Sequence, residues 1–542
     1  MEMKDLALPS LNRFASDYLQ NRLEAEDYFH YDLSKQDMYR DRYNELMSRV
    51  FSRHELSDYI QRYMSRLSSS EAVNRNIERL RKNDSVVVIG GQQAGLLSGP
   101  LYTIHKVISI IKLAKEQEKE LGSPVIPVFW IAGEDHDLAE VNHVYVMKNG
   151  KPHKKTYPSY QPYKTMVSDV ELETEKAEKW FEEIIETYGE TAFTNKLLFD
   201  MKGMIKESNT FTDFFARLIH EWFREYGLLL VDAGDPELRQ IEKGHFASMI
   251  EKSERIAAVV EDQQSFMQAK GYPKMIEMDK QAANLFYYDP DKKDRCLLER
   301  VEGGFSGKNS EASFSEAELL AIANDHPERL SNNVITRPLM QEMLFPVLAF
   351  ISGPGEIAYW AELKRAFELF SMKMPPIIPR LNITLVERGV QTDIEDMELT
   401  LETVLTEGTA KAVKRFLDSV EDETIADLFR KLKSQLEENH KKLADHAVSL
   451  DGGLEPMLKK NIEFIQKQLE FMYGKIGDRT KERHAVILKK YERIAHSLYP
   501  LESPQERIWN AFYYLNQYGP EFIRDIMKLD YQFNNQHKLI FI

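Results

Sequence analysis

VVVIGGQQAGLLSGPLYTIHK, residues 86–106, is the stretch that decides the fold. Its four consecutive β-branched apolar residues, Val86–Ile89, predict a buried strand of a parallel sheet. A glycine-rich loop follows, and apolar spacing predicts a helix from Leu101 through Ala114 with Pro100 at its first position. In α/β proteins, this order of strand, glycine loop and helix presents backbone N–H groups to an anionic ligand. The alternative is a tight turn that needs small residues and binds no ligand.

Length and composition are those of a globular protein with several domains. The 542 residues allow two to four domains, and 43% hydrophobic with 29% charged residues is an ordinary composition for a soluble chain. No run of about 18 apolar residues occurs, and the first residues lack the pattern of an export signal. We therefore expect a cytoplasmic protein without a membrane span. A single cysteine excludes an intramolecular disulfide and a Cys-x-x-Cys metal site.

The net charge of −16 argues against a nucleic-acid partner, because the field of the whole chain repels phosphates. A local basic cleft is compatible with this charge, but solubility explains it more simply. We expect no nucleic acid among the partners.

Four ionisable residues follow a second apolar run. Val125–Ile131 predicts another buried strand, and Glu134, Asp135, His136 and Asp137 come shortly after it. Ligands of open α/β sheets bind at the carboxyl ends of the strands, so these four are candidate catalytic residues for acid–base work or for holding a substrate amine. The alternative is a helix N-terminus that one of the two aspartates caps. Such a cluster can also bind a metal, but His136 is too little for a zinc site because it has no histidine or cysteine partner at metal-ligand spacing. We therefore assign no residue to a metal, and the sequence leaves the metal dependence of the protein unknown.

Two later apolar runs also end in candidate loops. Leu228–Val231 is followed by Asp232, a possible site residue or cap, and Val347–Ile351 is followed by Gly353–Glu356, which repeats the arrangement of strand, glycine loop and helix. Two such loops in one sheet favour a shared cleft. Arg337 and Gln341, four residues apart, would share a helix face from which the guanidinium can point to an anion. The candidate substrate-binding residues are Gln93, Gly95, Gly99, Pro100, Thr103, Arg337, Gln341, Gly353, Gly355, Glu356 and Tyr359.

The C-terminal part of the chain has helical periodicity. Apolar residues recur at steps of three, four and seven between residues 425 and 476, and Asp451–Gly453 interrupts them. This pattern predicts an antiparallel helical hairpin or coiled coil that can pair with a second copy. The aromatic, amphipathic segment after residue 500 is expected to pack back onto the body of the protein.

The expected domain organisation follows from these patterns. We expect an α/β core over residues 1–385, with inserted segments at about 150–225 and 270–335. The second insertion has short strands and turns, and its Cys296 is expected to be a core thiol. A helical coiled-coil domain over 386–500 and a helical tail over 501–542 complete the chain.

Five motifs together resemble a known family. The segments GQQAGLLSGPLYTIHK, FWIAGEDHD, VITRPLMQEMLFP, SGPGEIAYW and QERIWN, spread over residues 91–510, are similar to those of the bacillithiol-biosynthesis cysteine-adding enzymes. The resemblance implies a Rossmann-like core related to class I aminoacyl-tRNA synthetases and nucleotidylyl transferases, and a coiled coil that forms a homodimer. It implies a ligase that adds L-cysteine to the amine of glucosaminyl malate to form bacillithiol, a low-molecular-weight thiol.

By position, the resemblance implies an anion-binding loop at Gln93, Gly95, Gly99 and Pro100. It also implies an acidic strand end at Glu134–Asp137 and a third wall at Gly353–Glu356. The resemblance assigns no residue to a cofactor.

The chain departs from the related synthetases in its activation motifs. The HIGH-type and KMSKS-type signatures are absent, Gly99–Tyr102 stands at the position of the first, and no Walker A pattern replaces them. Amide formation from a free carboxylate needs activation, so ATP is expected from the chemistry although no motif shows how it would be held.

We expect backbone N–H groups between Gly95 and Thr103 to steady phosphate charge. One carboxylate of Glu134–Asp137 would hold the cysteine ammonium or take a proton from the attacking nitrogen, and His136 is a candidate base because its ordinary pKa suits that role. Arg337 would meet the malate carboxylates. The alternative function is a non-catalytic dimeric coiled-coil scaffold or cysteine-delivery module, which the missing activation motifs favour. A sugar-nucleotide transferase fits the fold but not the combined motifs.

Overall fold

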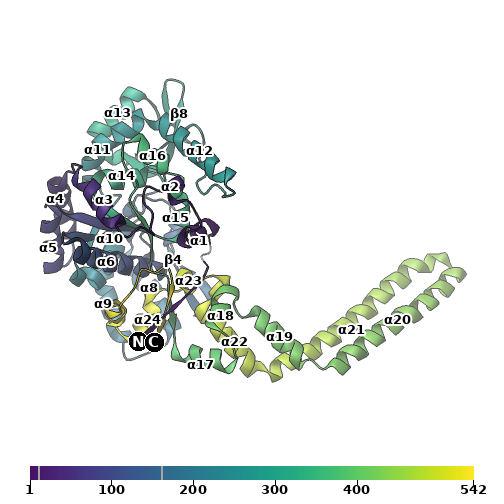
Figure 1. Ribbon diagram of the computed structural model, residues 1–542. Helices are drawn as coiled ribbons and strands as arrows, with labels where there is room; N and C mark the ends of the chain where they lie inside the picture. The colour runs from purple at the N-terminus through teal and green to yellow at the C-terminus, as the bar shows by residue number, and fades with distance from the viewer. Residues whose placement is uncertain (10–11, 160, 162) are drawn as a thin grey trace. The chain divides into compact units, whose positions relative to one another are not determined.

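The computed structural model describes residues 1–9, 12–159, 161 and 163–542, and the chain divides into two compact units (Figure 1). The first unit comprises Met1–Thr384 and Gln505–Phe541. The second comprises Leu385–Pro504 together with Ile542. The C-terminal tail therefore returns to the unit in which the chain begins.

A five-stranded parallel sheet forms the centre of the first unit. Its order is β13-β12-β2-β3-β6, with these bounds: β2 (Val86–Gln92), β3 (Val125–Ile131), β6 (Leu229–Asp232), β12 (Val347–Ser352) and β13 (Ile377–Pro379). The strands β2, β3, β6 and β12 are mainly apolar and are buried over nearly their whole length, because helices cover both faces of a parallel sheet. The parallel sheet predicted from the apolar runs is thereby confirmed.

The order of the strands in the parallel sheet determines which of the loops that follow them lie close together. From the central β2 the chain proceeds outward through β3 to β6, then returns to the other side of β2 as β12 and β13. The order reverses between β2 and β12, and open α/β sheets bind ligands at such a point, beyond the carboxyl ends of the strands. The register pairs Gln92 with Ile131 and Ile131 with Asp232, so these strand ends form one edge.

Helices surround the sheet. Beside β2 runs α6 (Tyr102–Leu121), which ends at Gly122 in the left-handed conformation, φ 69°. The remaining helices of the first unit are α1 (Arg13–Leu19), α2 (Ala25–Tyr28), α3 (Met38–Met47), α4 (Arg53–Met64), α5 (Glu71–Leu80), α7 (Leu138–Val141), α8 (Thr174–Tyr188), α9 (Thr194–Lys206), α10 (Phe211–Phe223), α11 (Pro236–Glu251), α12 (Ser253–Ala269), α13 (Glu316–Asp325), α14 (Thr336–Leu344), α15 (Pro354–Ala361), α16 (Lys364–Leu369), α23 (Gln505–Ile508), α24 (Ala511–Tyr518) and α25 (Phe522–Lys528).

A second, antiparallel sheet is built from the predicted β-rich insertion. Its order is β10-β9-β8-β7-β11, with β7 (Ala282–Asp289), β8 (Asp294–Val301), β9 (Gly304–Gly307), β10 (Ser313–Ser315) and β11 (Leu330–Asn332). Cys296 is buried on β8, as expected of a core thiol. The edge strand β11 leads directly into α14, so this sheet is connected to the helix that carries Arg337.

Two strand pairs were missed from the sequence. The first residues form β1 (Glu2–Leu6), which pairs antiparallel with β15 (His537–Phe541) of the tail. Neither segment has a periodicity of its own, and each becomes a strand through its distant partner. At the start of the first inserted segment, β5 (Lys151–Thr156) forms a hairpin with β4 (His143–Lys148). Their turn is Asn149-Gly150, both at positive φ, and Asn-Gly is a hairpin signal that sequence inspection can use.

The second unit is helical apart from the end of β14 (Ile383–Val386), the strand where the units join. Two long helices, α20 (Glu423–Leu450) and α21 (Glu455–Arg483), run side by side (Figure 1). The short connection between them contains Asp451-Gly452-Gly453. The predicted antiparallel helical hairpin is confirmed. The other helices of this unit are α17 (Arg388–Asp396), α18 (Leu401–Glu407), α19 (Ala410–Val420) and α22 (Ala485–Leu498).

A buried ion pair anchors the tail within the first unit. Glu506 accepts two hydrogen bonds from the Arg380 guanidinium, at 2.6 and 2.5 Å, and Oε2 lies 2.9 Å from Nδ1 of His105. Burial alone would raise the pKa of the Glu506 carboxyl, but the Arg380 charge and both hydrogen-bonding partners outweigh it and hold the pKa well below its usual value. Arg380 directly follows β13 in the sequence, so Glu506 neutralises a cation at the carboxyl edge of the parallel sheet.

We predict that Glu506→Gln destabilises the first unit by about 3–5 kcal/mol, because the substitution leaves the buried Arg380 charge without its counter-ion. Thermal unfolding, followed by circular dichroism, measures the loss. The control is Glu521→Gln on the same tail, since Glu521 pairs with Arg524 at the surface and its removal should cost less than about 0.5 kcal/mol. Equal midpoints for the two variants would contradict the anchoring role.

Candidate active site at the strand ends

The loop after β2 is closely packed. A Cβ on Gly95 would lie 2.8 Å from Cα of Gly99, and Gly99 itself has a φ of 68°. Both positions therefore need glycine for the turn. The helix begins at Tyr102 with Leu101 as its N-cap, so the prediction that Pro100 is the first helical residue is wrong.

Several N–H groups of this loop bond within the chain. The N–H of Gly99 donates to Leu96, that of Leu101 donates to Trp509, and that of Thr103 donates to Pro100. Pro100 and Asn510 form an isolated bridge, and the Asn510 amide donates to the carbonyl of Gly99 at 2.8 Å. The tail thus occupies part of the backbone surface that was expected to receive an anion.

Lys106 supplies a positive charge at the point where strand order reverses. Its buried ammonium donates to the carbonyl of Gly91 at 2.7 Å, to Oε1 of Gln92 at 3.2 Å and to Oε2 of Glu356 at 2.6 Å. The same carboxylate oxygen accepts the N–H of Gly353 at 2.7 Å. Burial lowers the pKa of the Lys106 ammonium, and the Glu356 charge opposes this shift.

Arg337 and Gln341 both lie on α14. Arg337 donates to the hydroxyl of Tyr359, and its charge interacts with Glu356 and Glu134. Burial raises the pKa of Tyr359 to about 12, so it remains a neutral phenol. The amide of Gln341 is buried, and neither its oxygen nor its nitrogen bonds to any residue that the structure describes. A Cβ on Gly355 would meet nothing within 4 Å, so its own chain does not require glycine there.

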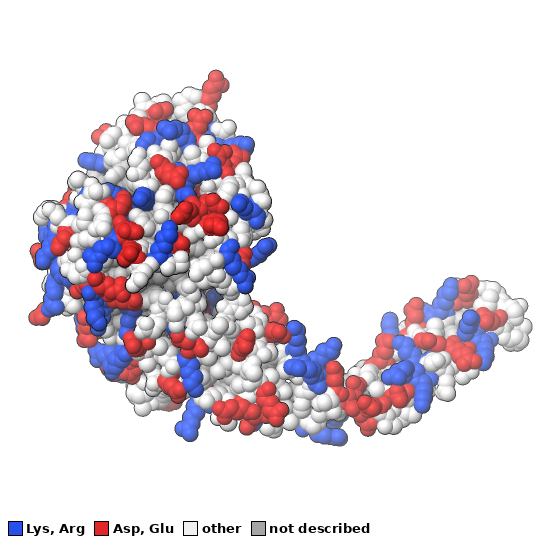
Figure 2. Space-filling view, viewed as in Figure 1, with Lys and Arg blue, Asp and Glu red and all other residues white. Residues whose placement is uncertain are grey.

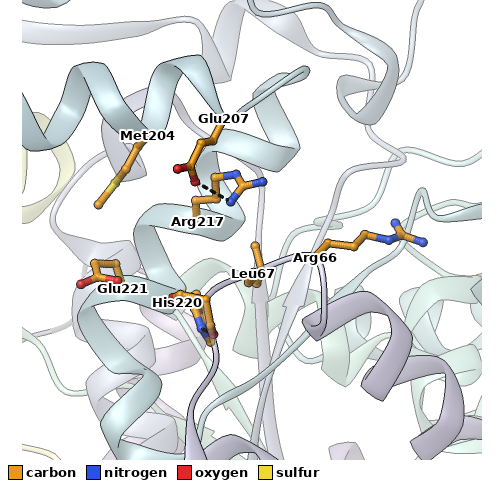
Figure 3. A pocket seen from close by; sticks show the side chains of 8 residues that line it. Arg66, Leu67, Met204, Glu207, Arg217, His220 and Glu221 are labelled. Carbon is orange, nitrogen blue, oxygen red and sulfur yellow. Dashed lines mark hydrogen bonds and ion pairs between the residues drawn. The ribbon is translucent and has the colours of Figure 1, made fainter.

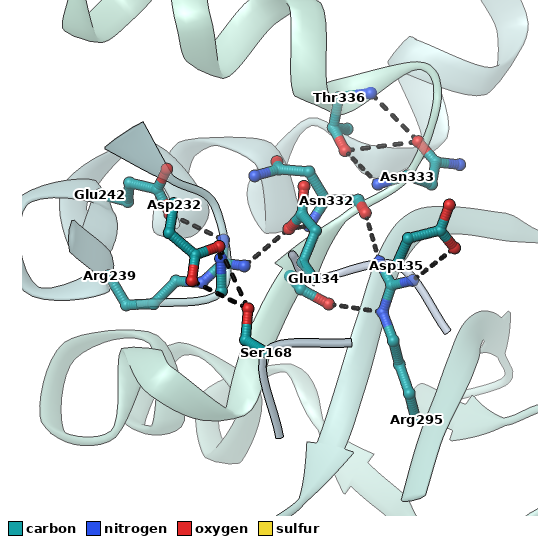
Figure 4. A network of polar contacts seen from close by, with 12 residues as sticks. Glu134, Asp135, Ser168, Asp232, Arg239, Glu242, Arg295, Asn332, Asn333 and Thr336 are labelled. Carbon is teal, nitrogen blue, oxygen red and sulfur yellow. Dashed lines mark hydrogen bonds and ion pairs between the residues drawn. The ribbon is translucent and has the colours of Figure 1, made fainter. Parts of the chain in front are cut away.

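The four residues after β3 have different roles in the structure, and Figure 4 shows two of them, Glu134 and Asp135. Glu134 is buried and accepts from Nη2 of Arg239 at 2.6 Å and from the N–H of Asn332 at 3.1 Å. Asp137 caps α7 by accepting the N–H of Ala139, as one alternative predicted. Asp135 is partly exposed, which leaves its carboxylate more accessible than that of Glu134.

Asp135 joins the loops after β2 and β3. Oδ2 accepts from Nε2 of Gln93 at 2.6 Å, and Oδ1 accepts the N–H of His136 at 2.7 Å. Burial raises the pKa of Asp135, but the Gln93 hydrogen bond and the Arg295 charge outweigh it, so the net pKa lies below the usual value. The carboxylate is ionised at neutral pH and suits a cationic group.

Arg295 of β8 brings the inserted sheet to this cluster. Its Nη1 lies 3.1 Å from Nδ1 of His136 and 4.0 Å from Oδ1 of Asp135. Its Nη2 donates to the carbonyl of Asn332 at 2.7 Å. The Asn332 side chain is buried, and its amide oxygen and nitrogen have no partner among the described residues. Together with the loop residues, Arg295 and Asn332 form what we call the strand-end cluster, whose members are Gln93, Lys106, Glu134, Asp135, His136, Arg295, Asn332, Arg337, Glu356 and Tyr359.

Asp232 interacts with the charge of Arg239, which is the partner of Glu134 (Figure 4). The side chain is buried at the end of β6 and accepts the Ser168 hydroxyl at 2.9 Å and the N–H of Gly234 at 2.8 Å. It does not cap α11, because Asp235 does, with Pro236 at the first turn. A Cβ on Gly133 would meet Asp232 at 2.1 Å, which explains glycine there. Desolvation raises the pKa of Asp232 to about 7.

A cavity of about 470 Å³ lies elsewhere in the first unit (Figure 3). Arg66, Arg217 and His220 line it, with Arg217 paired to Glu207. None of its lining residues comes from the loops after β2, β3 or β12. We therefore identify the candidate site from the strand ends that converge at the carboxyl edge of the parallel sheet, and not from this cavity.

No group of three or more metal-ligating side chains occurs in the part of the chain that the structure describes. No helix there is long and apolar enough to cross a membrane. On the face shown in Figure 2, acidic and basic side chains are interspersed over both units.

Sequence inspection missed Lys106, Arg239, Arg295 and Asn332. Lys106 stands within the opening motif, and a lysine so close to a strand-end loop is a usable signal. Arg239 lies one turn into α11, after the Asp-Pro cap. Arg295 and Asn332 belong to the inserted sheet, and no local pattern connects them to β3.

We predict that Asp232 makes the first unit less stable as pH rises from about 4 to 7. Its pKa is higher in the folded protein, about 7, than its ordinary value of 3.8, so between these values the folded state holds a proton that the unfolded state has lost. The free energy of unfolding then falls by up to about 1.4 kcal/mol per pH unit for this proton. Urea unfolding across this range should show a shallower decline for Asp232→Asn, and an unchanged slope for the exposed control Asp291→Asn. Parallel slopes for wild type and Asp232→Asn would contradict the assignment.

Comparison with known proteins agrees with this architecture. Residues 1–381 match the family described as Bacillithiol biosynthesis BshC, N-terminal Rossmann-like domain, and residues 383–542 match its C-terminal coiled-coil domain. The chain is 44% identical to a protein of Geobacillus thermodenitrificans and 42% identical to one of Bacillus velezensis, each over 100% of both chains. Both relatives are named "Putative cysteine ligase BshC". The chain belongs to the BshC family of bacillithiol biosynthesis.

Proposed function

We propose that this protein is a ligase that joins the carboxyl carbon of L-cysteine to the amine nitrogen of glucosaminyl malate, with ATP activating the carboxylate. The names of the relatives support cysteine ligation. The observation that carries the proposal is the strand-end cluster at the switch point of the sheet, in which Arg295 lies 4.0 Å from the ionised carboxylate of Asp135. Lys106 and Arg337 add two further positive charges to the cluster, both of which interact with Glu356. A zwitterionic amino acid and a dicarboxylate need this combination of charges.

Asp135 is the residue that best fits the cysteine ammonium. It is partly exposed and ionised, whereas Glu134 is committed to Arg239 and Asp137 caps α7. Arg337, whose guanidinium is planar and always charged, suits a carboxylate of cysteine or malate. The unpartnered amide of Gln341 on the same helix supplies a further donor and acceptor.

The cluster also has the charge that ATP requires. Forming the amide removes one carboxylate oxygen from cysteine, and ATP takes up that oxygen on a phosphoryl group. We propose that Arg337 meets the phosphates by charge in place of a Walker A loop, while Lys106 stays paired with Glu356. An ATP-dependent biosynthetic reaction fits the cytoplasmic location expected from the sequence.

The test is synthesis by the purified full-length protein. Incubation with L-cysteine, glucosaminyl malate, ATP and Mg²⁺ should yield bacillithiol, detected by mass spectrometry, and consume ATP only when cysteine is present. No product under these conditions, including with other divalent metals, would contradict the proposal.

We predict that Asp135→Asn raises the KM for cysteine about 10- to 100-fold, because a charged hydrogen bond to the ammonium is lost. The matched control is Asp137→Asn, in which asparagine still caps α7 and activity should stay near the wild-type value. Steady-state kinetics at varied cysteine concentration measures both. An unchanged KM in Asp135→Asn would place the ammonium elsewhere.

We further propose that the protein is a homodimer through the helical hairpin of the second unit. The seam between α20 and α21 uses half-buried residues such as Ile462 and Ile465. A second apolar stripe on α21 is exposed at intervals of seven residues: Met457, Phe464 and Phe471. Aromatic and apolar residues at this spacing are typical of a coiled-coil seam and favour a second copy as the partner.

We predict that Phe464→Ser combined with Phe471→Ser converts a dimer into a monomer, because the substitutions remove the largest apolar groups of the exposed stripe. Size-exclusion chromatography with light scattering measures the mass. Lys467→Ser, an exposed position on the same helix, is the control and should remain dimeric. A wild-type protein that is already monomeric at micromolar concentration would contradict the proposed dimer.

A further inference from the structure

We propose that Arg295 of the inserted sheet fixes His136 as the neutral tautomer that carries its proton on Nε2. His136 then acts toward the substrate as a hydrogen-bond donor and not as the general base expected from the sequence. The tautomer is inferred from geometry alone, and its role toward substrate depends on the proposed ligase function.

Arg295 is held rigidly. Its Nε donates to the Ser331 hydroxyl at 2.9 Å and its Nη2 to the Asn332 carbonyl at 2.7 Å. The guanidinium carbon lies 3.8 Å from the centroid of the Phe286 ring. The side chain is 4% exposed, so these contacts leave it little freedom. Its Nη1 is thereby aimed at Nδ1 of His136, 3.1 Å away.

This contact determines the donor and the acceptor. An arginine guanidinium carries only donors and keeps its charge in proteins, so the nitrogen that faces it must offer a lone pair. Nδ1 of His136 is therefore the acceptor. In neutral imidazole one nitrogen accepts and the other donates, which leaves the proton on Nε2.

The charges around His136 act in both directions. Arg295 and Lys164 disfavour an imidazolium, whereas Asp135 and Asp137 favour it. Asp135 is 4.0 Å from the His136 ring nitrogen, farther than Arg295, and the Phe286 ring adds an apolar surface with its centroid 5.7 Å from that of the imidazole. Burial and then the Arg295 charge lower the pKa of His136, in agreement with a neutral ring.

A neutral imidazole with its proton on Nε2 has a definite chemical use. It cannot accept a proton at Nε2, because that nitrogen has no free lone pair. It can donate a hydrogen bond to oxygen as negative charge develops there, and a fixed donor of this kind is effective because it needs no reorganisation during the reaction. The matching group in an amide-forming reaction is the carboxyl-derived oxygen of cysteine.

The tautomer is tested by nitrogen NMR of full-length protein labelled with ¹⁵N-histidine, with His136→Gln used to assign the signals. We expect a protonated Nε2 and an unprotonated Nδ1 at neutral pH. In Arg295→Met, we expect a mixture of tautomers and a higher pKa for His136. Arg300→Met, on the same strand but bonded only to backbone carbonyls, should leave the signals unchanged. A proton on Nδ1, or an imidazolium at neutral pH in the wild type, would overturn the proposal.

Activity provides the second readout. Glutamine can donate from its amide nitrogen near the position of Nε2, but it cannot act as a base. We expect His136→Gln to keep kcat within about tenfold of the wild type, and His136→Ala to lose about 10²- to 10³-fold. Equal losses in both variants would overturn the donor role. An inactive wild type would instead contradict the ligase proposal, while the NMR result would still decide the tautomer.

Discussion

The buried ion pair between Lys106 and Glu356 is the interaction on which the candidate site depends. It joins the first helix after β2 to the helix after β12, across the point where the order of the parallel strands reverses. A charge buried there is costly unless it is paired and hydrogen-bonded, and Lys106 meets that condition through Glu356 and two groups at the end of β2. The pair thereby holds the two halves of the sheet edge in one arrangement.

The same rule explains the rest of the polar edge. Arg239 is paired with Glu134 and Glu242, and Arg380 with Glu506. Both cations are buried; Arg239 receives Glu134 from the loop after β3 and Glu242 from its own helix, and Arg380 receives Glu506 from the tail. Asp135 differs because it remains partly exposed, and for that reason we propose it as the carboxylate that meets a substrate cation.

The inserted antiparallel sheet contributes residues to the candidate site. Through Arg295 and Asn332 it reaches the residues after β3, and the geometry of that contact decides which nitrogen of His136 bears the proton. The tail has a comparable effect on the loop after β2, since Trp509 and Asn510 bond to its backbone. A site first attributed to three loops of the parallel sheet is therefore shaped by the inserted sheet and the tail as well.

Apolar runs and helical periodicity were sufficient to locate four strands of the parallel sheet and the helical hairpin, because burial of a strand and amphipathicity of a helix are local properties of sequence. The acidic segment and the glycine loops could also be located, because each follows one of these apolar runs in the sequence. The sequence alone could not show which charges pair, since Lys106 and Glu356 are 250 residues apart and His136 and Arg295 are 159 apart. It also left the strands β1 and β15 undetected, because each is stabilised by pairing with the other end of the chain. Hydrogen-bond partners at such separations, and with them the protonation of His136, were decided only by the tertiary structure.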